Sequence, residues 1–133
     1  MHEKLLALIL RCSGIVLLIA LIPAFMPFGW MRDIHSWLGM GELPTGPIMG
    51  YLTRSLSLLY AMHGALILYI SGNIPRFLPI VKCLAILGIA FGIILTFLDA
   101  ALGMPLYWIL FEGPFLIPLN IGILWLTFRI RES

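Results

Sequence analysis

Residues 77–102, FLPIVKCLAILGIAFGIILTFLDAAL, decide the fold, because this run has the length and composition of a membrane-spanning helix. A spanning helix needs about 20 predominantly apolar residues. Three further runs meet this requirement, at residues 5–28, 47–70 and 106–128. Together the four runs predict an all-α fold, a polytopic membrane protein built as a bundle of four transmembrane helices.

The composition excludes an ordinary soluble domain. Hydrophobic residues make up 62% of the chain and charged residues 11%, whereas about 25% of a soluble domain is charged. Four spans with short connections use nearly all of the 133 residues, so we expect one transmembrane domain over residues 1–133 and no soluble catalytic module. The net charge of +2 is too small to indicate a nucleic-acid partner, and the lipid bilayer is the expected partner.

The lysines and arginines indicate how the chain is oriented. Six of the eight fall on one side of the four predicted spans. They are Lys4, Arg11, Arg76, Lys82, Arg129 and Arg131. The positive-inside rule makes that side cytoplasmic. We therefore expect a multi-pass protein of the cell inner membrane with both termini cytoplasmic.

The first outer connection contains a short amphipathic segment. In residues 30–38, WMRDIHSWL, an α-helix puts Trp30, Ile34 and Trp37 on one face, with the charged side chains largely away from it. Tryptophan is enriched where a membrane meets water. The pattern predicts a short interfacial helix anchored by Trp30 and Trp37, with a partner-docking surface as the alternative.

Small residues follow one stripe of each middle span, at spacings of three or four. The stripe of the second span is Gly50, Arg54, Ser57, Ala61 and Gly64, with Leu52, Leu56, Leu59 and Leu66 opposite. The stripe of the third span is Ala85, Gly88, Gly92, Thr96 and Asp99. Small residues let helix backbones approach closely, and the Gly88–Gly92 pair has the familiar spacing of such contacts. We therefore predict helix packing at Gly88 and Gly92.

Both stripes also carry a charge, which packing alone does not explain. Arg54 lies seven residues after Pro47 and is thus about 10 Å from the outer end of its helix. Glu112 lies seven residues after Pro105, at the same depth, and Asp99 lies about one turn from that surface. We predict a cluster of Arg54, Asp99 and Glu112. It is either a buried ion pair that fixes helix register or a binding site for a proton, a cation or a substrate amine.

A second polar group is expected in the cytoplasmic half of the bundle. Arg11 and His63 lie at comparable depths, and Tyr60 precedes His63 by one turn, so these three form a possible secondary polar site. Cys12 and Cys83 fall inside predicted spans and are expected to be small buried residues. The sequence contains no metal-binding or catalytic motif, so we expect no metal, no cofactor and no catalytic residue.

Two strings resemble segments of small bacterial four-helix membrane proteins. They are RSLSLLYAMHG at residues 54–64 and DAALGMPLYW at residues 99–108. In size and helix count the chain is also similar to the DoxX-like family, with Arg11-x-x-Gly14 as the matching element in the first span. The resemblance implies a four-helix fold in a bacterial inner membrane and carries no catalytic assignment.

Three functions are compatible with these observations. The first is a small integral membrane subunit or accessory protein that packs against other membrane helices or associates with itself. The alternative is a small oligomeric transporter or proton-linked carrier that works through Arg54, Asp99 and Glu112. The third is a membrane enzyme that acts on a lipid or a quinone, with the same acids as general acid and base.

Overall fold

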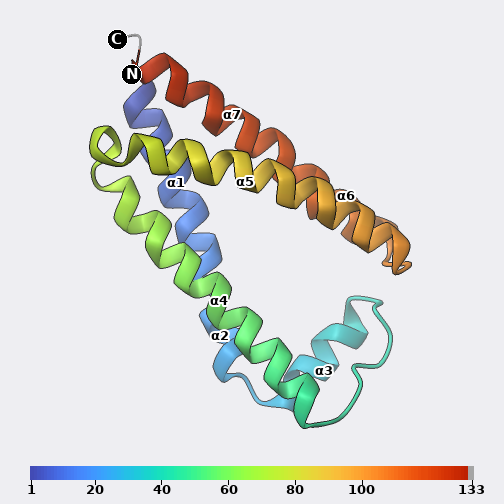
Figure 1. The fold of residues 1–133 in the computed structure, drawn as a ribbon. Coiled ribbons are helices and arrows are strands. Elements are labelled where there is room, and N and C mark those ends of the chain that lie inside the picture. The colour runs from blue at the N-terminus through green and yellow to red at the C-terminus, as the bar shows by residue number, and fades with distance from the viewer. Residues whose placement is uncertain (132–133) are drawn as a thin grey trace. The chain divides into compact units, whose positions relative to one another are not determined.

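The chain is all-α, as predicted, in a computed structural model that describes residues 1–131 (Figure 1). The helices, in order, are α1 (His2–Ile19), α2 (Leu21–Phe25), α3 (Phe28–Trp37), α4 (Pro47–Ser71), α5 (Ile74–Ala101), α6 (Leu106–Phe111) and α7 (Gly113–Arg131). They form two compact units. The first comprises Met1–Ile9 and the chain from Ile70 onward, and the second is Leu10–Tyr69. Each unit is described by itself.

Three helical segments are long and apolar enough to cross a membrane: His2–Phe25, Ile74–Ala101 and Leu106–Ile130. They correspond to the first, third and fourth predicted spans. The second predicted span is the 25-residue helix α4, which is long enough to cross but is not among these three. Its lower hydropathy follows from Arg54, His63 and its serine and threonine residues. That α4 crosses the membrane, which would bring the number of spans to four, therefore stays a prediction.

Prolines end the first spanning helix at an earlier residue than the apolar composition of residues 5–28 suggested. We predicted a span over residues 5–28, but its helix ends at Phe25 and Phe28 begins α3. Met26 is extended, with ψ 141°, because a residue that precedes a proline is driven out of the helical region. Within the same run the helix is interrupted at Ala20. Pro23 lacks the N–H that would bond to the carbonyl of Ile19.

In the first unit, α5 and α7 lie side by side (Figure 1). Asn73 begins α5 as its N-cap, and its side-chain oxygen accepts a hydrogen bond from the Arg76 N–H at 3.2 Å. Gly92 is buried on the face of α5 toward α7: a Cβ placed there would stand 3.0 Å from the carbonyl oxygen of Gly113. The two backbones approach this closely because neither residue has a side chain.

In the second unit, α1 and α4 cross at a pair of glycines. A Cβ on Gly64 would stand 2.6 Å from the carbonyl oxygen of Gly14. Gly64 belongs to the small-residue stripe of α4, of which Gly50, Ala61 and Gly64 are buried. The leucines on the opposite side of α4 are exposed: Leu52, Leu56, Leu59 and Leu66. The helical periodicity thus identified the inner and outer faces of α4.

Candidate functional site

Two carboxyl groups meet where α5 ends and α6 joins α7. Asp99 lies in the last turn of α5 and is only 6% exposed. Glu112 lies between α6 and α7 and is half-buried. Its side chain hydrogen-bonds to the Asp99 carboxyl group and accepts a hydrogen bond from the Trp108 indole. We call Asp99 and Glu112 the acid pair.

A break in the backbone places Glu112 at this point. Its φ and ψ are −89° and −83°, outside the helical region, and its N–H still bonds to the Trp108 carbonyl at 3.0 Å. Pro114 explains the break, because it lacks an N–H and its ring collides with the carbonyl four residues earlier. The Glu112-Gly113-Pro114 sequence is therefore the point at which the chain divides into α6 and α7.

The packing around the acid pair is tight. A Cβ on Gly113 would collide with the hydroxyl oxygen of Thr96, on the turn of α5 that precedes Asp99. About two turns further along α7, Asn120 lies against Gly88, and its amide donates to the carbonyl of Leu116 at 2.8 Å. The Gly88 and Gly92 positions thus lie on the face of α5 that contacts α7.

One oxygen of the acid pair is left without a partner. Among the described residues, Asp99 Oδ2 is a buried side-chain oxygen with no hydrogen bond. A hydrogen bond between two carboxyl groups also needs a proton, since an ionised carboxylate can only accept. The acid pair is therefore suited chemically to hold a proton or to receive a cationic group, because either supplies the missing donor.

Arg54, the third residue of the predicted cluster, belongs to the second unit, and no geometry between it and the acid pair is defined. Within its own unit, its Nη2 donates to the carbonyl oxygen of Met26 at 3.3 Å. That carbonyl lies in the extended link between α2 and α3. The cluster of Arg54, Asp99 and Glu112 stays a prediction, whereas the contact between the two acids is observed.

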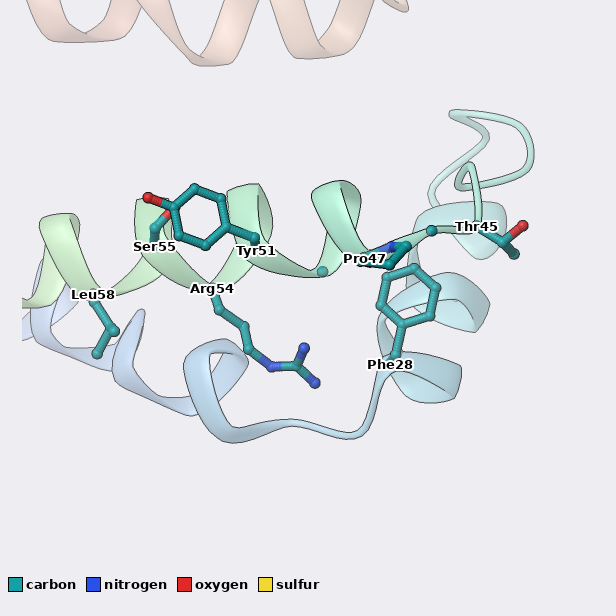
Figure 2. Close-up of a pocket in the computed structure, with 9 residues that line it drawn as sticks. Phe28, Thr45, Pro47, Tyr51, Arg54, Ser55 and Leu58 are labelled. Carbon is teal, nitrogen blue, oxygen red and sulfur yellow. The ribbon is translucent and has the colours of Figure 1, made fainter.

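Arg54 lines a pocket of about 550 Å³ at the start of α4. Figure 2 shows its side chain leaving α4 toward Phe28, while Tyr51 and Ser55 stand on the other side of the helix. The Ser55 hydroxyl donates to the Leu52 carbonyl at 3.2 Å and is thus occupied within α4. Thr45 and Pro47 complete the polar and apolar rim near the helix start.

The remaining predicted residues differ in their exposure. Arg11 is exposed, and Tyr60 and His63 are half-buried in the same unit, so the secondary polar site stays a prediction.

The segment expected to be an interfacial helix is indeed helical, as α3. Its Trp30 and Trp37 are 65% and 84% exposed, and their role as membrane anchors stays a prediction.

The cysteine prediction was wrong. Cys12 and Cys83 are free and exposed rather than buried. Each lies on an exposed face of its helix. An apolar run alone does not say which of its faces is covered.

Three contributors to these sites were missed in the sequence. Trp108 lies four residues before Glu112, a spacing that puts two side chains on one helix face, and this signal was available. Asn120 was visible as a lone amide in an apolar run. The carbonyl of Met26 carried no signal beyond the proline that follows it.

Comparison with known proteins finds no match to a family model, to a curated protein or to a solved structure. The likeness to small four-helix membrane proteins accordingly stays a prediction. Within residues 1–131 no group of three or more histidine, cysteine, aspartate or glutamate side chains is arranged to hold a metal ion.

Proposed function

We propose that the chain is a small subunit or accessory protein of a bacterial inner membrane that packs, as a bundle of four spans, against other membrane helices or against copies of itself. One observation carries the proposal: in the most apolar window of each of the three candidate spans, only 17% of the residues are buried inside the chain. Apolar helix surface of this extent has to be covered by lipid or by partner helices.

Aromatic contacts support the proposed orientation. At one end of the first unit, the Lys82 ammonium lies 3.9 Å from the centre of the Phe128 ring, and the Arg129 guanidinium lies 5.2 Å from that of Trp125. The His2 ring also meets Trp125, edge to face. Cations combined with aromatic rings are typical of the cytoplasmic membrane–water interface. This end is therefore the proposed cytoplasmic end.

Cysteine labelling tests whether α4 spans. In a background without Cys12 and Cys83, we expect Ser36→Cys to react with a membrane-impermeant maleimide in intact spheroplasts. Asn73→Cys should react only after permeabilisation, because α4 separates the two positions. Labelling of both positions from the same side would show that α4 does not cross, and the four-span proposal would then fail.

Native mass spectrometry tests the subunit proposal. The untagged protein, extracted from its native membrane in a mild detergent, should be recovered with other membrane proteins or with its own copies at fixed stoichiometry. A monodisperse monomer over a range of detergent concentrations would contradict the proposal.

The acid pair favours a second function, that of a proton-linked carrier. A buried carboxyl oxygen without a partner, beside a second carboxyl group at a helix break, is an arrangement that transporters use. In proteoliposomes with an entrapped pH-sensitive dye, a potential-driven proton influx should be abolished by Glu112→Gln. Glu42→Gln, which changes an exposed acid in the loop before α4, is the matched control. An influx unchanged in Glu112→Gln would remove this candidate.

A further inference from the structure

The guanidinium of Arg54 lies closer to the start of α4 than the backbone of Arg54 does. Its Nη1 lies 3.2 Å from the position that a Cβ on Gly50 would occupy, one turn toward the N-terminus. Its Nη2 reaches back to the Met26 carbonyl. If α4 spans as proposed, the Arg54 backbone lies about 10 Å from the outer end of the helix, and one turn is about 5.4 Å. The guanidinium then lies about 5 Å from that end, where long cationic side chains meet lipid headgroups.

The pocket at Arg54 has the charge and the donors to bind an anion. None of the nine described residues that line it is acidic. A guanidinium has five N–H donors in a planar fork, and the observed bond to Met26 uses one of its two terminal nitrogens. The remaining donors match the oxygen spacing of a phosphate group, which arginine binds with two parallel hydrogen bonds.

A second, apolar hollow begins at the residue that Arg54 contacts. It measures about 450 Å³ and is lined by Leu21, Ile22, Phe25, Met26, Pro27 and Trp30. Met26 therefore accepts the hydrogen bond from Arg54 through its carbonyl and also lines this hollow. A free phosphate ion has nothing to fill an apolar hollow, whereas the acyl chain of a phospholipid does.

We propose that the second unit binds one anionic phospholipid, with the phosphate on Arg54 and an acyl chain in the hollow at α2 and α3. The exposed Trp30 at the rim of the hollow fits this position, because tryptophan favours the headgroup level. The proposal rests on the spanning of α4, which the cysteine labelling above tests separately. It adds a lipid ligand to either of the proposed functions.

Native mass spectrometry of the full chain in a mild detergent, titrated with phosphatidylglycerol, tests the site. We expect Arg54→Gln to weaken retention of the lipid about tenfold or more, since hydrogen bonds to charged groups contribute about 1.5–3 kcal/mol. Arg32→Gln is the matched control, because it removes an exposed arginine of α3 that pairs with Asp33. Its effect should stay within twofold. Equal losses in both variants would overturn the proposal.

A second variant covers the case in which Arg54→Gln does not fold. Gly50→Ala keeps the charge but places a methyl carbon 3.2 Å from Arg54 Nη1, which displaces the guanidinium slightly, so it should weaken retention by up to about threefold. Diacylglycerol, which lacks phosphate, should not be retained, and millimolar inorganic phosphate should not displace the phospholipid. Retention of diacylglycerol as strong as that of phosphatidylglycerol, or displacement of the phospholipid by inorganic phosphate, would contradict a phospholipid site at Arg54.

Discussion

The two charged regions of the chain handle their polar groups in opposite ways. The acid pair lies in a tight contact between helices, with one buried oxygen left unbonded. Arg54 lies in an open pocket and bonds to a backbone carbonyl. A short side chain such as aspartate stays where its helix puts it, whereas arginine reaches a polar partner along a flexible stem. Among the described residues, the buried oxygen without a partner therefore belongs to the acid pair, whereas Arg54 keeps further donors in an open pocket.

The largest effect is expected where the α5–α7 contact is closest. Gly113→Ala should lower the free energy of unfolding by about 1–3 kcal/mol, because the new Cβ collides with Thr96 and the backbone of Gly92. Far-UV circular dichroism during thermal unfolding in micelles measures it. Gly122→Ala on the same helix is the control, since nothing lies within 4 Å of its Cβ position. A neutral Gly113→Ala would show that α5 and α7 are not packed this closely.

The next effect concerns the contact between the two acids. Asp99→Asn supplies an amide donor for Glu112, so that the contact no longer needs a shared proton, and it removes one of two neighbouring carboxyl groups. It should therefore raise the free energy of unfolding by about 1–2 kcal/mol. Asp33→Asn, at the exposed acid that pairs with Arg32, should change it by less than about 0.5 kcal/mol. Destabilisation by Asp99→Asn would mean that the Asp99 charge has a cationic partner.

A double-mutant cycle tests whether the two regions act together. A cluster of Arg54 with the acids requires a coupling free energy above about 0.5 kcal/mol between Arg54→Gln and Asp99→Asn. Because the guanidinium already contacts Met26 and Gly50, we expect additivity within about 0.5 kcal/mol. Unfolding of the two single variants and the double variant in the same detergent decides this. Coupling above that limit would restore the cluster as predicted from the sequence.

The smallest effect is expected at α3. With Trp37 as the single tryptophan, lipids brominated near the headgroup should quench its fluorescence more strongly than lipids brominated near the chain ends, because an interfacial helix lies at the headgroup level. A single-tryptophan chain that retains Trp125 serves as the comparison. Equal quenching at all depths, or none, would exclude α3 as an interfacial anchor.

The sequence predicted what depends on periodicity and missed what depends on side-chain direction. The buried stripe of α4, from Gly50 to Gly64, followed from its spacing. The Glu112-Gly113-Pro114 sequence also accounts for the break between α6 and α7. The exposure of Cys83 was missed because position within an apolar run was taken as burial, without asking which face the stripe of Gly88 and Gly92 leaves uncovered. The reach of Arg54 to Met26 depends on the rotamer of a long side chain and on the extended link before Pro27, neither of which a helical pattern records.

The bond between Arg54 and Met26 also bears on how the chain enters the membrane during synthesis. The two residues are 28 positions apart, so the carbonyl at the end of the first apolar run emerges from the ribosome well before its donor does. An apolar segment that ends in an unpaired carbonyl is poorly suited to lipid alone. The first spanning helix and α4 are accordingly expected to leave the insertion machinery as a pair. Arg54 of α4 then supplies the hydrogen bond to the carbonyl at the end of the first spanning helix.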